Sequence, residues 1–132
     1  MNREEILERV SHCLSEVLDI EMADIHETST LINDLGADSL DLLDLIFNLE
    51  QQFNIKLSVR YLEKKAKDDL GGVPVEIDGV YTPEAMERIR ESMPEVPPGE
   101  LPDGLTVQEL PLRFRVATMV NLVEKTLEEK NV

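Results

Sequence analysis

The 132-residue sequence predicts an all-α protein: a small helical bundle with an inserted segment between its second and third helices. Two observations lead to this fold class. Apolar residues recur at helical spacing near both ends of the chain, in residues 3–18, 38–53 and from 106 onward. Roughly fifty residues between Leu57 and Thr106 have patterns of their own. Because this length suits one domain, we predict a single domain over 1–132 with an insertion at about 58–104.

The first helix is expected from Arg3 to Leu18, where one stripe of side chains is apolar: Ile6, Val10, Cys13, Leu14 and Val17. Residues 19–35 follow with acidic and hydroxyl side chains, which indicates a long loop. Three scattered aliphatic residues are expected to hold this loop on the core: Ile25, Leu31 and Ile32.

The second helix is expected over residues 38–53 and is strongly amphipathic. Its apolar positions follow a helical period: Leu40, Leu43, Ile46, Phe47, Leu49 and Phe53. Polar residues occupy much of the opposite side: Asp41, Asp44, Asn48, Gln51 and Gln52. We therefore expect one buried face and one acidic, solvent-facing side.

Ser39 occupies a distinctive position at the start of this helix. Asp38 is a good N-cap, and Asp41 adds negative charge in the first turn, where the helix dipole favours it. Gly36 permits a positive φ, so the preceding loop can turn sharply and present the Ser39 hydroxyl. With no histidine or lysine nearby in sequence to deprotonate it, Ser39 is a poor nucleophile. It is better placed to be modified by another enzyme.

The run Leu35-Gly36-Ala37-Asp38-Ser39-Leu40-Asp41 and the acidic helix after it resemble the attachment signature of the acyl carrier proteins. The resemblance covers Met1 to about Leu57 well and Leu105 to Val132 more weakly. It implies an acyl-carrier-like helical bundle in which Ser39 bears 4′-phosphopantetheine, transferred from coenzyme A. The terminal thiol of this arm would hold an acyl group as a thioester.

The same resemblance implies a carrier rather than an enzyme, with no catalytic residue, in fatty acid or specialised lipid synthesis. Its partners would be a phosphopantetheinyl transferase and acyl-transfer and lipid-synthesis enzymes with basic docking patches. We expect five residues to contact them: Asp38, Leu40, Asp41, Asp44 and Glu50. Gln51 replaces an acid often found at that position in the family. Two alternatives remain: a carrier for polyketide or nonribosomal peptide assembly, and an interaction protein of this fold without the arm.

The net charge of −15 is concentrated in the first part of the chain. Residues 1–55 hold two basic and thirteen acidic residues, whereas residues 56–132 hold eleven and fifteen. Such a field repels nucleic acid and anionic membranes, and steers the protein toward surfaces rich in lysine and arginine. No apolar run reaches membrane-spanning length, and the start Met-Asn-Arg-Glu-Glu lacks a secretory signal. We expect a cytoplasmic monomer that neither binds nucleic acid nor inserts into membranes.

The single cysteine, Cys13, excludes an internal disulfide and shares the apolar stripe of the first helix, so we expect a buried, inert thiol. His12 and His26 form no ligand cluster, and residues 33–38 do not fit a calcium loop. No metal site is predicted.

The insertion is expected to contain several short elements. Residues 58–70 fit a helix ended by Gly71-Gly72, and residues 73–81 fit a hairpin that turns at Asp78-Gly79. Thr82 and Pro83 start a displaced third helix over 83–93. Residues 95–104 predict an exposed loop, and a capping-box pattern at Thr106–Glu109 predicts the start of the last helix, which continues to about Leu127.

The role of the insertion has two interpretations. It could supply a partner surface, with a basic spot at Lys64, Lys65 and Lys67. Alternatively, a set of apolar residues could enlarge the interior for a long acyl chain: Tyr61, Leu62, Met86, Ile89, Met93 and Phe114. We favour the first, because apolar residues at helical spacing are more often plain core than a ligand site.

Overall fold

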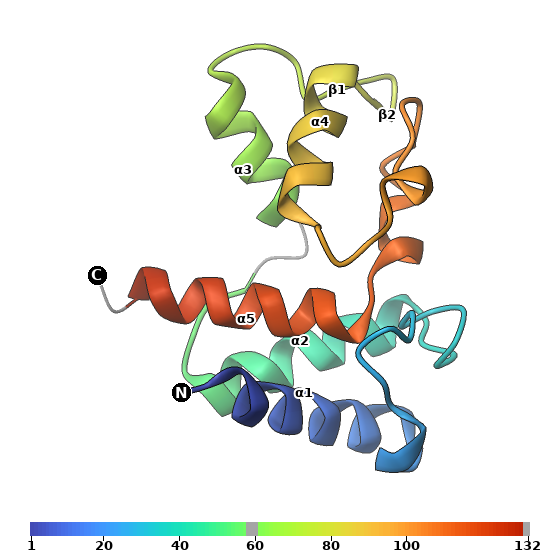
Figure 1. Ribbon diagram of the computed structural model, residues 1–132, viewed down its shortest axis with the longest axis vertical. Helices are drawn as coiled ribbons and strands as arrows, with labels where there is room; N and C mark the ends of the chain where they lie inside the picture. Colours follow the sequence, from blue (N-terminus) through green and yellow to red (C-terminus); the bar gives the residue numbers. More distant parts are fainter. Residues whose placement is uncertain (58–60, 131–132) are drawn as a thin grey trace. The chain divides into compact units, whose positions relative to one another are not determined.

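The computed structural model describes the backbone of residues 1–57 and 61–130, and their side chains apart from those of 61–63. The described residues are mostly helical, with one two-stranded sheet, which confirms the predicted all-α class with an inserted helix and a small hairpin (Figure 1). The chain divides into two compact units, Met1–Ser58 with Phe114–Val132, and Val59–Arg113. Each unit is described by itself.

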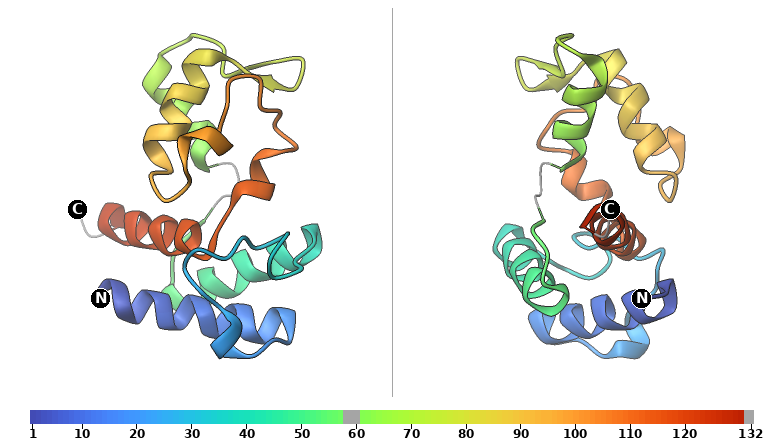
Figure 2. Two further views of the ribbon diagram at one scale, coloured as in Figure 1. Left: turned by 45° about the vertical axis from the view of Figure 1, so that its right-hand side comes forward. Right: turned by 90° about the vertical axis from the view of Figure 1, so that its left-hand side faces the viewer.

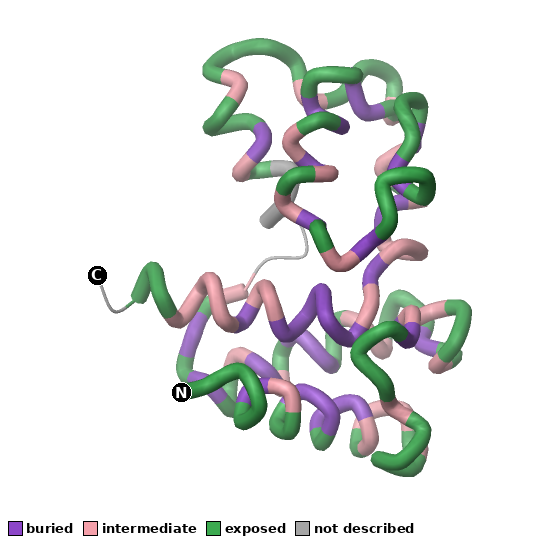
Figure 3. The backbone as a smooth tube through the Cα atoms, viewed as in Figure 1, coloured by how far each residue is buried: buried purple, intermediate pink, exposed green. Residues whose placement is uncertain are grey.

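The first unit contains three long helices, α1 (Arg3–Leu18), α2 (Ser39–Phe53) and α5 (Val116–Lys130). Helix α1 has the predicted bounds and packs against both α2 and α5 (Figure 2). The start of α1 and the end of α5 lie at the same end of this unit, so the two helices run antiparallel. The buried residues of α5 lie in its N-terminal half (Figure 3).

The long loop between α1 and α2 is held on the start of α5 by its backbone. Leu31 N–H donates to the Phe114 carbonyl at 2.9 Å, and Val116 N–H donates to the Ser29 carbonyl at 3.0 Å. Leu31 is fully buried, whereas Ile25 and Ile32 are half-buried. Of the three aliphatic residues expected to hold the loop, Leu31 therefore contributes most.

The buried face of α2 differs from the expected one. Its core residues are Leu45, Ile46, Leu49 and Phe53, which lie on one side at helical spacing. Leu40, Leu43 and Phe47 were expected to share that face but are exposed. The apolar residues of this helix cover more of its circumference than one packed face requires, and contact with α1 decides which of them are buried.

The second unit contains α3 (Tyr61–Leu70), α4 (Pro83–Ser92) and the hairpin of β1 (Glu76–Ile77) and β2 (Val80–Tyr81). Helices α3 and α4 pack against each other. The buried residues of this unit include Ala66, Tyr81, Ala85, Met86, Ile89, Met93, Val96, Leu101, Leu105 and Leu110. The insertion thus has an apolar core of its own.

The hairpin and α4 confirm the local predictions. Asp78 and Gly79 have φ values of 54° and 80°, as a type I′ turn requires. Thr82 caps α4 by accepting from Ala85 N–H at 3.2 Å, and Pro83 occupies the first helical position. Gly71 and Gly72, both with positive φ, follow the end of α3. The predicted start of α3 at Ser58 lies outside the described residues.

Two predictions for the later part of the chain were wrong. The last helix begins at Val116 rather than near Thr106. The reciprocal hydrogen bonds of Thr106 and Glu109 do form, but only a 3₁₀ turn over Leu110–Arg113 follows them. Pro111 contributes to the interruption, because it lacks the N–H that would bond to the Val107 carbonyl in an α-helix starting near Thr106.

The segment 95–104 is also not simply an exposed loop. It contains a 3₁₀ turn over Pro98–Glu100, and Val96 and Leu101 are buried. Arg90 on α4 donates to the Leu101 carbonyl at 2.9 Å and pairs with Asp103 at 3.3 Å. These contacts join the segment to the core of the second unit. Burial of the Val96 and Leu101 side chains there stabilises the fold.

Candidate functional site at the start of helix α2

Ser39 is the first residue of α2, and its side chain is exposed. Of the other serines whose side chains are described, Ser11 and Ser29 are buried, and Ser15 and Ser92 are half-buried. Within the described part of the chain, Ser39 is therefore the serine that an incoming enzyme reaches most easily.

The cap of α2 is formed without Ser39. Asp38 Oδ1 accepts from Asp41 N–H at 2.9 Å, and Asp41 Oδ2 accepts from Asp38 N–H at 3.0 Å. This reciprocal pair is the predicted N-cap extended to a full capping box. Because Asp38 supplies the cap, the Ser39 hydroxyl is not needed for it.

The turn before Ser39 is held by hydrogen bonds on both sides. Thr30 and Asp34 exchange bonds, since Asp34 Oδ2 accepts from Thr30 N–H at 2.8 Å and Thr30 Oγ1 accepts from Asp34 N–H at 2.9 Å. Ala37 is buried and donates its N–H to the Leu31 carbonyl at 2.9 Å. Gly36 has a φ of 79°, which confirms the expected sharp turn. The serine is thus presented from an ordered loop.

The N-terminus of α2 favours a negatively charged group on Ser39. The first-turn N–H groups of a helix have no partner within the helix, and its dipole places partial positive charge there. A phosphate ester at Ser39 would lie beside this charge, a favourable contribution of about 0.3 to 1 kcal/mol at an exposed position.

An exposed apolar stripe follows Ser39 along α2, and of its residues the sequence had indicated only Leu40 as a partner contact. The stripe consists of Leu40, Leu43 and Phe47, which are 71%, 57% and 61% exposed. Asp44 is exposed and lies four residues after Leu40 and three before Phe47, so it borders the stripe. The sequence does indicate such a surface, because α2 has more apolar residues than one buried face requires.

The residues expected to contact partners differ in whether their side chains already form hydrogen bonds within the protein. Asp38 and Asp41 are committed to the cap. Glu50 is half-buried, and its Oε2 accepts from Leu57 N–H at 2.9 Å, so it also fastens the chain that leaves α2. Leu40 and Asp44 are exposed near Ser39. The site is therefore concentrated in the first two turns of α2.

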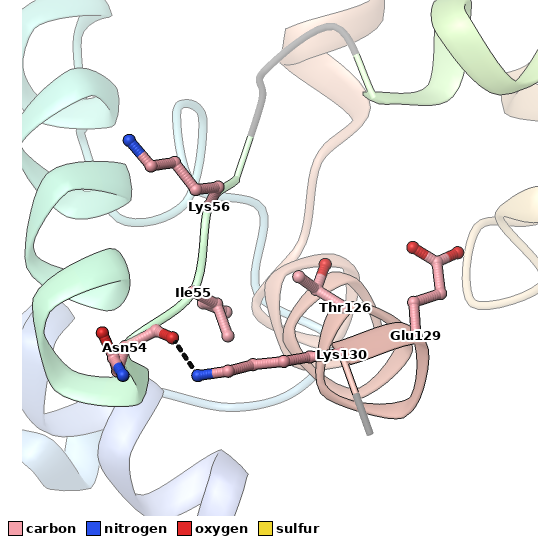
Figure 4. Close-up of a pocket in the computed structure, with 6 residues that line it drawn as sticks. All are labelled: Asn54, Ile55, Lys56, Thr126, Glu129 and Lys130. Carbon is pink, nitrogen blue, oxygen red and sulfur yellow. Dashed lines mark hydrogen bonds between the residues drawn. The ribbon is translucent and has the colours of Figure 1, made fainter. Parts of the chain in front are cut away.

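A hollow of about 460 Å³ lies at the other end of α2, against α5 (Figure 4). It is lined by Asn54, Ile55, Lys56, Thr126, Glu129 and Lys130. Lys130 Nζ donates to the Asn54 carbonyl at 2.5 Å, close to the C-terminus of α2, where a cation is favoured. This contact gives the lysine a structural role and needs no ligand.

In the described part of the chain, the other candidate residues form neither a reactive site nor a metal site. Cys13 is buried, and burial together with the charge of Glu16 raises the pKa of its thiol, which fits the expected inert cysteine. Within the same residues, no group of three or more histidine, cysteine or acidic side chains is arranged to hold a metal ion. None of the described helices has the length and apolar content to cross a bilayer.

A model of a known protein family matches the part of this chain that contains Ser39. The sequence model described as "Phosphopantetheine attachment site" matches residues 8–66, which include Ser39. The acyl carrier protein of Thermotoga maritima is 44% identical over 63 residues, which are 48% of this chain and 78% of that protein. That of Prochlorococcus marinus is 44% identical over 57 residues, 43% and 71% of the two chains. That of Guillardia theta is 40% identical over 57 residues, 43% and 70% of the two chains.

Proposed function

The chain belongs to the acyl carrier protein family, and on that premise we propose that Ser39 is the residue that bears its prosthetic arm. The protein is an acyl carrier with a covalently attached 4′-phosphopantetheine group. The observation that supports Ser39 most directly is its exposure at the start of α2, while Asp38 supplies the helix cap. Its hydroxyl is then available for transfer of the arm from coenzyme A.

A mass measurement tests the attachment site. Incubation of the full chain with coenzyme A and a broad-specificity phosphopantetheinyl transferase should add one phosphopantetheine mass to the wild type and none to Ser39→Ala. Ser92→Ala, which alters a half-buried serine in the second unit, is the matched control and should be labelled like the wild type. Labelling of Ser39→Ala would refute this assignment.

Partner enzymes should dock on the first three turns of α2. The exposed stripe of Leu40, Leu43 and Phe47 offers apolar surface beside Ser39, and Asp44 adds negative charge at its border. Residues 1–55 carry a net charge of −11, which attracts a basic patch and speeds encounter. These features fit a phosphopantetheinyl transferase and acyl-transfer or lipid-synthesis enzymes with an apolar surface rimmed by lysine and arginine.

The cellular role that fits these features is that of a cytoplasmic, monomeric shuttle in fatty acid or specialised lipid synthesis, with no catalysis of its own. A carrier for polyketide or nonribosomal peptide assembly would share the serine and the arm. The acyl or aminoacyl group found on protein from the native cell separates these roles. An arm-less protein of this fold would show no mass increase under any transferase.

The insertion is better suited to partner binding than to sheltering an acyl chain. Met86, Ile89 and Met93 are buried within the second unit, where they belong to its own core. Phe114 belongs to the first unit, and the side chains of Tyr61 and Leu62 lie outside the described residues. Exposed Lys64 and Lys67 remain candidates for a basic contact, with Asp68 and Asp69 close by on the same helix.

A further inference from the structure

Large apolar side chains are exposed at two clusters in the described part of the chain. One is the stripe of Leu40, Leu43 and Phe47 on α2. The other is in the insertion, where the paired Ile77 and Val80 are 61% and 37% exposed, and Val73, three residues before β1, is 44% exposed. Outside these clusters, exposed large apolar side chains among the described residues are Met1 and Met22. The hairpin pair lies in a different unit from Ser39 and calls for a separate account.

The hairpin holds two of these side chains side by side. Ile77 pairs with Val80 across the strands, and Val80 also pairs with Thr106, so the three lie in one row across adjoining backbone segments. Tyr81, the next residue along β2, points to the opposite face and is fully buried. The apolar pair is therefore on the outer face of a sheet whose inner face packs on the core.

This outer face is fixed by backbone hydrogen bonds on both sides of β2. Thr82 N–H donates to the Val75 carbonyl at 2.9 Å, and Tyr81 N–H donates to the Leu105 carbonyl at 3.0 Å. Val107 N–H donates to the Gly79 carbonyl at 2.9 Å. Because the apolar pair is ordered before any partner arrives, little side-chain or loop entropy remains to be lost on binding.

The charged residues of the hairpin itself, Glu76 and Asp78, are both acidic. Residues 73–87 contain four acidic residues and no lysine or arginine. Asp78 is exposed in the turn beside Ile77, and the Glu109 carboxylate is held on Thr106, which pairs with Val80, by hydrogen bonds of 3.2 and 2.9 Å. Glu76 is also exposed, but it pairs with Tyr81 and so belongs to the other face of the hairpin. The hairpin therefore combines exposed aliphatic side chains with acidic neighbours, as the first turns of α2 do.

We propose that the hairpin face, defined as Ile77 and Val80 with Asp78 and the Glu109 carboxylate held on Thr106, is a second docking surface of this protein. Its partner is a protein surface with apolar residues at its centre and lysine or arginine at its rim. A second copy of this chain does not fit, because two acidic rims would face each other. Addition of a strand to β1 is disfavoured by Pro74, which has no N–H, and by the charge of Glu76 at the edge.

Crosslinking from Val73, an exposed residue three positions before β1, identifies the partner. Val73→p-benzoylphenylalanine in the full-length protein leaves Ile77 and Val80 intact, and irradiation of the source cells should link a specific protein to it. The control is Met22→p-benzoylphenylalanine, an exposed position in the first unit. The linked protein is identified by mass spectrometry and purified, and its Kd for the uncrosslinked full chain is measured.

The double substitution Ile77→Thr and Val80→Thr tests the apolar contact. Threonine keeps the β-branched shape that suits a strand, so the hairpin should persist in circular dichroism and melting curves. We expect Kd to rise by about tenfold or more, the scale of losing buried aliphatic surface. Met22→Thr should leave Kd unchanged, and Ile77→Val should retain most of the binding.

Neutralising the acids tests the charge contact. Asp78→Asn with Glu109→Gln removes two charges; asparagine tolerates the positive φ at position 78, and glutamine keeps an oxygen that can accept from Thr106. Binding should weaken at low salt, and its salt dependence should fall. Ser39→Ala should bind the same partner with unchanged Kd, so failure of the hairpin proposal is distinguishable from failure of the attachment-site proposal.

Several results would overturn the hairpin surface. These are the absence of any protein linked from position 73 above the position 22 control, or links only to a second copy of this chain. Unchanged binding after Ile77→Thr with Val80→Thr would also refute it, as would complete loss of binding in Ser39→Ala.

Discussion

Phe47 and Phe53 occupy the same helix, yet packing gives them different roles. Phe53 is buried in the core of the first unit, and the guanidinium of Arg9 lies 5.7 Å from the centre of its ring. Phe47 is exposed on the stripe beside Ser39. One aromatic residue therefore contributes to stability, and the other offers a surface that a partner can bury.

Alanine at each position should separate stability from recognition. Phe53→Ala should lower the free energy of unfolding by about 3–5 kcal/mol, because it leaves a cavity in the core. Phe47→Ala should change it by no more than about 0.5 kcal/mol, as expected for an exposed position. Phe47→Ala should still slow arm transfer to Ser39. Urea unfolding and transferase kinetics measure the two effects, and equal destabilisation by both substitutions would contradict the buried face described for α2.

The burial of Cys13 predicts how the free energy of unfolding depends on pH. Burial, with the nearby charge of Glu16, raises the pKa of its thiol above the ordinary value, so the native protein favours the neutral form. This stabilisation is fully present below the unfolded-state pKa and is lost as the pH rises through the folded-state pKa. The unfolding free energy of the wild type should therefore fall relative to that of Cys13→Val as the pH rises above about 9.

Chemical labelling gives a second measurement of the same thiol. Iodoacetamide should alkylate Cys13 much more slowly in the native protein than in urea, because the reactive thiolate is scarce and the sulfur is buried. Equal rates in both states would show that the thiol is accessible.

At the scale of elements, the start of α2 depends on the reciprocal hydrogen bonds of Asp38 and Asp41. Asp38→Ala removes this cap and should lower the free energy of unfolding by about 0.5–2 kcal/mol. Ser39 should then lie on a frayed turn, so its modification should slow. Asp38→Asn keeps a side-chain oxygen and should retain most of the stability. Hydrogen exchange of the first-turn amides compares the two variants, and equal protection would mean that the cap is unimportant.

Asp44 allows charge to be tested apart from capping, since it lies outside that hydrogen-bond pair. Asp44→Lys should reduce the rate of modification of Ser39 at low salt and weaken its salt dependence, because a basic partner surface would meet less negative charge. Stability should change by no more than about 0.5 kcal/mol. An unchanged rate at low salt would place recognition elsewhere on the protein.

At the scale of the whole molecule, the two compact units allow the insertion to be removed. A protein that joins residues 1–58 to 114–132 through a flexible glycine-serine linker retains α1, α2 and α5. We expect it to fold and to be modified at Ser39, because the contacts of α1 with α2 and with α5 remain. Circular dichroism and intact mass are the measurements. A protein that does not fold would show that the first unit needs the insertion.

Acylated forms test whether the insertion shelters the acyl chain. A ligand that binds only the folded state raises the melting temperature. If residues 59–113 line a cavity, long acyl groups should stabilise the full chain more than the shortened one. We expect the same stabilisation of both proteins at every chain length, in agreement with a partner-binding role for the insertion.

The sequence by itself determined the features that depend on residues close together in the chain. The bounds of α1, the cap of α2 at Asp38, the turn at Asp78-Gly79 and the start of α4 at Thr82-Pro83 all follow from it. Each rests on a hydrogen bond or a backbone preference that acts within about four residues, so no distant part of the chain is needed to predict it. The attachment motif around Ser39 is local in the same sense.

Only the tertiary structure decided what depends on distant partners. Packing on α1 selected Leu45, Ile46, Leu49 and Phe53 as the buried face of α2 and left Leu40, Leu43 and Phe47 exposed. The expected helix start at Thr106 instead forms a single bridge with Val80 of β2, and α5 begins at Val116, where the loop around Leu31 is bound. Burial and strand pairing depend on which segments meet in space. A local sequence pattern does not identify those segments.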